Sequence, residues 1–115
     1  MFIILYTPLL LASWFGHLDI AKILIVSGAN IVHVDNFNCT PLIRACQCSN
    51  YEIVKCLLEN GADPNSPNND GTPLQIACMT GDIDILESLL EHNADISATF
   101  KGFLIFGIKL LYILQ

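Results

Sequence analysis

The stretch that decides the fold is Thr40–Gly71, whose sequence is TPLIRACQCSNYEIVKCLLENGADPNSPNNDG. It begins with Thr-Pro-Leu, continues with an amphipathic segment, and then reaches Asn-Gly-Ala-Asp. The same order occurs before and after it, because Thr-Pro-Leu recurs at residues 7–9 and 72–74. The three starts are roughly 33 residues apart, and a period of this length indicates a protein built from stacked repeats.

Each Thr-Pro start predicts the beginning of a helix. Threonine caps a helix with its side-chain oxygen, and the following proline has its φ already set and no N–H to leave unpaired. The apolar residues within 53–58 are spaced three and four apart and predict a second, amphipathic helix. Gly61, or Asn93 in the third unit, can adopt the left-handed conformation that ends it. Such short helix pairs bury their apolar stripes only by stacking on one another.

Over about residues 4–102 the chain resembles the ankyrin repeat. The resemblance implies an all-α repeat solenoid, in which helix-turn-helix units are joined by β-hairpin-like fingers. We expect one domain with repeats at about 7–39, 40–71 and 72–102, followed by a degenerate repeat or apolar C-terminal cap at 103–115.

One departure from the family pattern recurs in every unit. The residue after Thr-Pro-Leu is usually histidine, whereas this chain has Leu10, Ile43 and Gln75. In the family that histidine helps to hydrogen-bond one unit to the next. Its replacement is expected to weaken the stack more than to change the fold.

The composition limits the classes of partner. The 115 residues are 53% hydrophobic and carry a formal net charge of -6, with no lysine or arginine between residues 57 and 100. Nucleic-acid affinity depends on cationic side chains, so a nucleic-acid partner is not expected. The acidic surface is either a solvated face that maintains solubility or an attraction for basic partner surfaces.

Five cysteines, an odd number, indicate free thiols. Cys46 and Cys78 occupy the same small buried position of their repeats, where cysteine acts as an apolar filler. Cys46 and Cys48 would point to different sides of a helix, so the pair predicts no metal site. Free thiols fit a reducing compartment, either cytosol or nucleus.

The two ends of the chain are unusually apolar. Residues 1–15 fit a first repeat, although they also have the apolar core of a signal peptide, which would make the protein a secreted effector. Residues 103–115 are too short to span a bilayer. They are expected to form a cap or broken repeat, with a partner or self-association surface and membrane contact as alternatives.

No pattern of catalytic residues is present. The serines have no Gly-x-Ser-x-Gly context, and there is no phosphate-binding glycine loop. The carboxylates within 82–91 lie on the polar side of a predicted helix, where nothing would separate their pKa values. We therefore expect no enzymatic activity, no cofactor and no metal.

The resemblance implies a protein-interaction module, a scaffold or adaptor, that binds a partner protein through its finger tips and inner helices. The alternative is a non-autonomous part of a longer ankyrin array. Phe37 is either a binding anchor at an exposed tip or a residue folded against the next finger. The expected contact residues are Trp14, Phe15, Asn36, Phe37, Cys39, Gln47, Cys48, Asn68, Asn69, Asp70, Met79 and Thr80.

Overall fold

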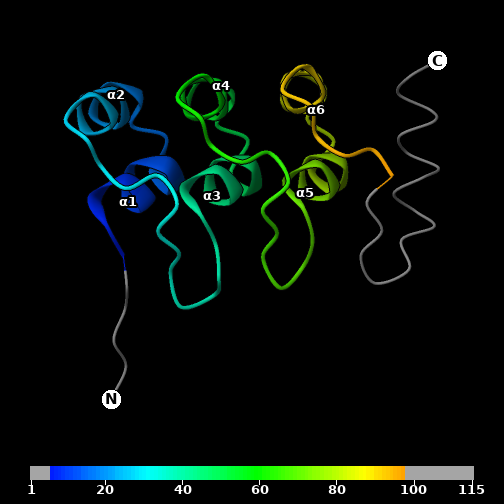
Figure 1. Cartoon of the computed structure of the whole chain (residues 1–115), viewed down its shortest axis with the longest axis horizontal. Helices are drawn as coiled ribbons and strands as arrows, with labels where there is room; N and C mark the ends of the chain where they lie inside the picture. The colour runs from blue at the N-terminus through cyan, green and yellow to red at the C-terminus, as the bar shows by residue number, and fades with distance from the viewer. Residues whose placement is uncertain (1–5, 98–115) are drawn as a thin grey trace.

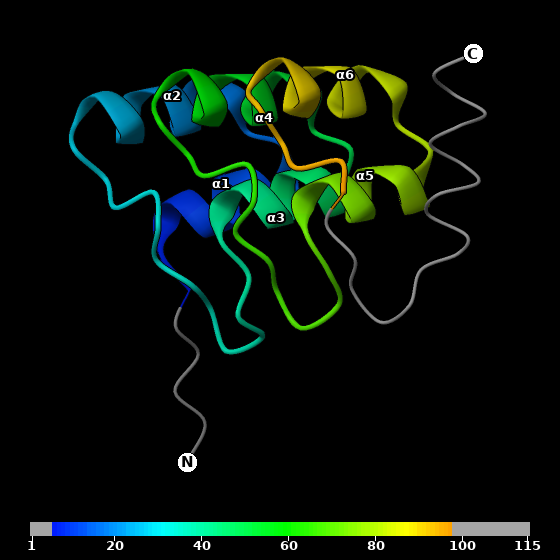
Figure 2. The same ribbon diagram turned by 45° about the vertical axis from the view of Figure 1, so that its right-hand side comes forward.

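The computed structural model describes residues 6–97, which form three helix pairs stacked side by side (Figure 1). The inner layer contains α1, α3 and α5, and the outer layer contains α2, α4 and α6 (Figure 2). None of the described residues is in a β-strand. The helices are α1 (Pro8–Phe15), α2 (Leu18–Val26), α3 (Pro41–Gln47), α4 (Tyr51–Glu59), α5 (Pro73–Thr80) and α6 (Ile83–Glu91).

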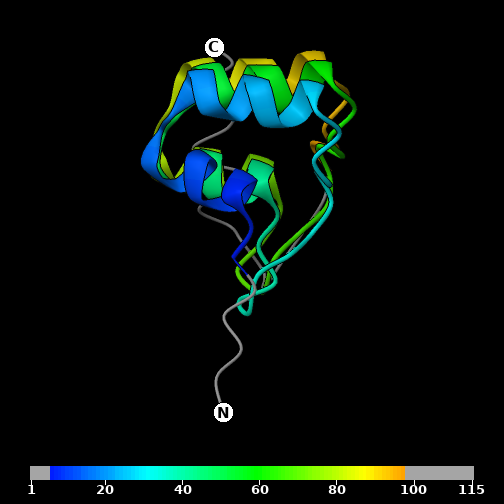
Figure 3. The ribbon, with the colours of Figure 1, turned by 90° about the vertical axis from the view of Figure 1, so that its left-hand side faces the viewer.

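This arrangement confirms the predicted all-α repeat stack. The connections 28–39 and 61–71 are long loops that extend from the inner layer, away from the outer helices (Figure 3). We call them the first and second finger. Each closes on a backbone hydrogen bond, Asp35 N–H to Cys39 O at 3.1 Å and Asn68 N–H to Gly71 O at 3.0 Å, but neither contains paired strands. The expected C-terminal repeat or cap at 103–115 lies outside the described residues.

Every inner helix begins as the sequence predicts. The capping hydroxyl oxygens accept backbone N–H groups three residues on: Thr7 from Leu10 at 3.2 Å, Thr40 from Ile43 at 3.1 Å, and Thr72 from Gln75 at 3.2 Å. Gln75 is fully buried, and its Oε1 accepts the N–H of Thr72 at 2.9 Å, which completes a capping box. At that position glutamine stabilises the start of its own unit.

Every outer helix is followed by a residue whose backbone is in the left-handed conformation. Gly28, Gly61 and Asn93 have φ values of 89°, 92° and 68°, so the chain leaves each outer helix in the same direction. A turn then recurs in which a side-chain oxygen accepts the N–H two residues on. The pairs are Asn30 with Val32 at 3.0 Å, Asp63 with Asn65 at 2.8 Å, and Asp95 with Ser97 at 2.9 Å.

Small side chains let neighbouring inner helices approach. Ser13, Cys46 and Cys78 occupy equivalent positions of α1, α3 and α5, and each is at most 1% exposed. Burial raises the pKa of the Cys46 thiol, which therefore stays protonated and acts as a small apolar group. The Ser13 hydroxyl has no hydrogen-bond partner among the described residues, so the first unit tolerates a polar atom where the others bury sulfur.

Asparagine side chains link neighbouring units. Asn50 Nδ2 donates to Ser13 O at 2.7 Å, and Asn65 Oδ1 accepts the N–H of Asp95 at 2.7 Å. Val32 stands at the position of Asn65 in the first unit, and its side chain cannot accept the corresponding bond. The first and second units therefore lack one inter-unit hydrogen bond that the second and third have.

The first unit has an uncovered apolar face. Ile20 is 50% exposed, although its equivalents Ile53 and Ile85 are 1% and 0% exposed because the preceding outer helix covers them. Leu11 and Ile23 are likewise 43% and 66% exposed. We refer to Leu11, Ile20 and Ile23 as the open face.

Leu57→Ala tests the shared core. Leu57 is fully buried on α4, in the middle unit, so its loss removes contacts and leaves a cavity. We expect the free energy of unfolding to fall by about 2 to 5 kcal/mol. Chemical denaturation of this variant and of Val26→Ala, whose side chain is 87% exposed, would measure the difference. Equal losses in both would show that the middle unit is not the core.

Val32→Asn tests the missing inter-unit bond. Residue 32 already makes the same local turn as Asn65, so an asparagine there can accept the N–H of Asp63 without moving the backbone. We expect a stabilisation of about 0.5 to 1.5 kcal/mol in denaturant unfolding. Val32→Ala, which removes the same exposed side chain without adding an acceptor, is the control. If the two variants are equally stable, the bond does not form.

Candidate functional site

Two exposed aromatic rings from different parts of the first unit lie against one buried cation. Trp14 is in the last turn of α1, and Phe37 is in the first finger. The Arg44 Cζ atom lies 4.7 Å from the centre of the Trp14 ring and 5.7 Å from that of Phe37. Both rings keep one side open to solvent, since they are 41% and 63% exposed. We call Trp14 and Phe37 the aromatic pair.

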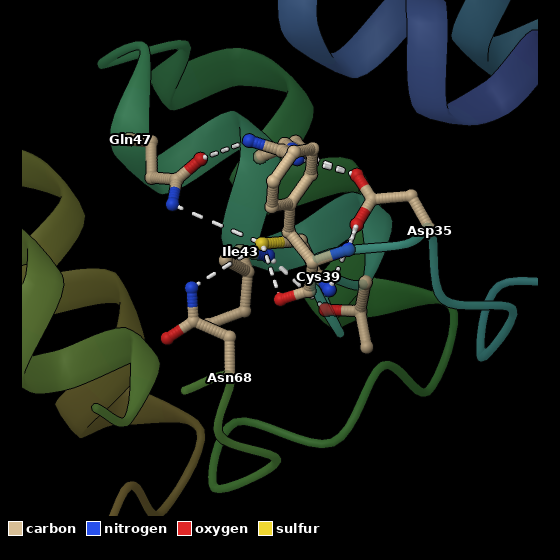
Figure 4. A network of polar contacts seen from close by, with 8 residues as sticks. Asp35, Cys39, Ile43, Gln47 and Asn68 are labelled. Carbon is tan, nitrogen blue, oxygen red and sulfur yellow. Dashed lines mark hydrogen bonds and ion pairs between the residues drawn. The ribbon is translucent and has the colours of Figure 1, made fainter. Parts of the chain in front are cut away.

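The cation that holds the aromatic pair is neutralised inside the protein. Arg44 is 7% exposed, and its Nη2 and Nε lie 2.6 and 2.8 Å from Oδ2 of Asp35. Its Nη1 also donates to Oε1 of Gln47 at 2.9 Å (Figure 4). A buried guanidinium needs such a partner because an unpaired charge is costly in the protein interior. Arg44 therefore adds little positive charge to the surface.

The same carboxylate orders the first finger. Asp35 Oδ1 accepts the backbone N–H groups of Phe37 at 2.9 Å and Cys39 at 3.2 Å. One side chain thus fixes the finger backbone with one oxygen and Arg44 with the other. The position of the Phe37 ring follows from both contacts, so the ring is held before any partner arrives.

The two fingers are joined by two residues predicted as surface contacts. Cys39 and Asn68 are only 1% and 4% exposed, and Asn68 Nδ2 donates to Cys39 Sγ at 3.2 Å. Asn68 Oδ1 accepts the N–H groups of Asp70 at 2.9 Å and Gly71 at 3.0 Å. The pKa of the Cys39 thiol is raised, mainly by burial. Cys39 and Asn68 hold the fingers together and are not available on the surface.

The remaining predicted contact residues reach the surface in varying degree. Phe15 and Met79 are 64% and 52% exposed, and Gln47 and Cys48 are half-buried. Thr80 is exposed, and its hydroxyl donates to the carbonyl of its own helix at 3.0 Å. Of the predicted contact residues on the fingers, Asn36, Phe37, Asn69 and Asp70 are exposed.

The prediction from the sequence missed Asp35 and Arg44, which connect these residues. One clue was available, because Arg44 is the chain's single arginine and lies between apolar residues of a predicted inner helix. Its partner could not be identified in the same way, since nine residues separate the two and the finger between them has no regular structure.

We also searched the described residues for a metal site, a membrane-spanning helix and disulfides. Within 6–97, no three histidine, cysteine, aspartate or glutamate side chains gather where they could hold a metal ion. No helix in this part of the chain is long and apolar enough to cross a membrane. None of the five cysteines, which all lie within it, forms a disulfide.

Comparison with known proteins agrees with the repeat architecture. The family model for ankyrin repeats matches residues 9–100 in three copies. An ankyrin repeat and KH domain-containing protein of Caenorhabditis briggsae is 40% identical over 60 residues, which are 52% of this chain and 2% of that relative. The chain thus spans a very small part of that protein's length. With three repeats recognised across most of its length, the chain belongs to the ankyrin-repeat family.

Proposed function

We propose that this chain is a protein-binding module, a scaffold or adaptor, whose partner docks on the fingers and inner helices. The observation that carries the proposal is the aromatic pair, two half-open rings held by the buried Arg44–Asp35 ion pair. Tryptophan and other large side chains in well-packed positions contribute most of the energy at protein interfaces. Rings that are already fixed lose little conformational freedom on binding.

Family membership supports the same proposal. Ankyrin repeats generally act as protein-protein interaction modules, which favours binding over catalysis. The proposed surface consists of the exposed and half-buried residues named above, with Cys39 and Asn68 supporting it from beneath. Cysteines that form no disulfide in the described part of the chain support a reducing compartment, cytosol or nucleus, as the place of action.

Photo-cross-linking tests the position of the surface. A benzophenone amino acid at residue 37 would report proteins that contact the first finger in cells. The same amino acid at residue 87, exposed on α6 in the outer layer, is the matched control. We expect adducts specific to residue 37. Identical adducts from both positions, or none from residue 37, would contradict the proposal.

Phe37→Ala distinguishes a binding anchor from a core residue. Its ring is 63% exposed, so its loss should change unfolding free energy by less than about 0.5 kcal/mol. Affinity for the cross-linked partner, measured by calorimetry, should fall by more than about 1 kcal/mol. Ile83→Ala, which truncates a 50% exposed apolar side chain on α6, should leave affinity unchanged. A large loss of stability in Phe37→Ala would instead make the ring part of the core.

A second candidate function is favoured by the open face of Leu11, Ile20 and Ile23. Equivalent positions in the later units are buried or half-buried against a neighbouring helix pair, so this face suits packing against another helix pair, as in a longer array or a self-associated form. It requires no partner at the fingers. The two candidate functions use different residues of the first unit.

Ile23→Glu tests this second candidate by size-exclusion chromatography with light scattering. We expect the unmodified chain to associate as its concentration rises, because 66% of the Ile23 side chain is exposed on an apolar face. A buried glutamate would oppose that contact, so the variant should be monomeric with an unchanged helical circular dichroism spectrum. Ile83→Glu, on α6, controls for added charge. Association that persists in Ile23→Glu would exclude the open face as its cause.

A further inference from the structure

We infer that the surface around the aromatic pair takes a lysine- or arginine-bearing peptide segment with an apolar anchor. The inference rests on the proposed protein-binding function and adds the chemistry of the partner. Its evidence is the distribution of charge around Trp14 and Phe37.

The fingers carry exposed carboxylates but no free cation. Asp63 and Asp70 are both exposed on the second finger, and Asp35 on the first is buried in its pair with Arg44. The half-buried His33 is the remaining titratable nitrogen-containing side chain of the two loops. A cationic partner therefore meets no fixed positive charge at the finger tips.

The lysines of the described residues lie elsewhere. Lys22 is exposed on α2 and Lys55 on α4, both in the outer layer, on the far side of the inner helices from the fingers (Figure 3). Both sides carry exposed carboxylates, but among the described residues the lysines lie only in the outer layer. A negative finger side favours association with a positive segment and disfavours an acidic one.

The second finger places a carboxylate close to the first finger. Asn68 is bonded to Cys39 of the first finger, and the Asp70 N–H is bonded to Asn68. Asp70 therefore lies two residues after Asn68, the residue of the second finger that contacts the first finger. A partner that covers the Phe37 ring can place a cationic side chain toward this carboxylate.

The rings themselves attract a cation as well as an apolar group. Aromatic faces bind lysine and arginine through the negative charge of their π-systems. Arg44 already lies against the aromatic pair. Because Asp35 neutralises Arg44 at 2.6 Å, Arg44 repels a second cation only weakly. Met79, which occupies the position of Trp14 in the third unit and is 52% exposed, adds an apolar contact further along the inner helices.

The test is selection from a phage-displayed library of random 12-residue peptides on the immobilised chain. We expect the selected peptides to combine lysine or arginine with a neighbouring aromatic or aliphatic residue. A synthetic peptide of the consensus can then be titrated while following Trp14, the single tryptophan of the chain. Replacing its basic residues by glutamine should weaken binding at least about tenfold, since charge pairs and cation-π contacts are both lost.

Matched variants of the protein locate the interaction. Asp70→Asn should lower the affinity for the basic peptide severalfold at low salt. Glu87→Gln on α6 should leave that affinity unchanged. Phe37→Ala should weaken it at least about fivefold, as expected for an anchor. Circular dichroism of each variant would verify that its helices are intact.

The outcomes separate the inference from the function on which it rests. Neutral or acidic peptides that bind in a Phe37-dependent way would overturn the inference and leave the proposed function standing. The inference also fails if basic peptides bind equally well to Asp70→Asn and Glu87→Gln. If the selected peptides bind Phe37→Ala as well as the unmodified chain, or if no peptide is enriched, both the inference and the proposed function are overturned.

Discussion

The structure depends on one constraint, which is that a short helix pair can bury its apolar residues only against another pair. Leu57 in the middle unit is fully buried, whereas Ile20 and Ile23 in the first unit are half or more exposed, since among the described residues no other helix pair covers them. Stability in such a stack comes from each unit together with its contacts to its neighbours. The small residues Ser13, Cys46 and Cys78 permit the close approach that these contacts need.

The proposed function follows from an exception to this apolar packing. Arg44 occupies a position where the third unit has Ile76, and its charge is balanced by Asp35. That ion pair fixes the backbone of the first finger and supports two aromatic rings from beneath. The stack thereby presents a rigid aromatic surface beside the exposed carboxylate of Asp70, on the side away from its lysines. The rigidity comes from the buried ion pair, whereas the surface charge comes from Asp70.

Much of the architecture could be predicted because it is encoded locally. A Thr-Pro pair caps a helix through atoms within three residues of one another, and Gly61 or Asn93 ends one through its own φ. The regular period of the repeat then predicts that these helix pairs stack on one another. At the position of the family histidine in the third unit, Gln75 forms a capping box, and asparagines at other positions, such as Asn50, supply bonds between units.

By itself, the sequence determined the helix pairs, their order and the family, since these follow from caps, apolar spacing and period. It also placed Trp14 and Phe37 among the contact residues, without showing what holds them. Only the tertiary structure decided that Cys39 and Asn68 are buried between the fingers, and that Asp35 pairs with Arg44. The physical reason is that burial and ion pairing in irregular loops depend on which distant side chains meet, and no local periodicity encodes that.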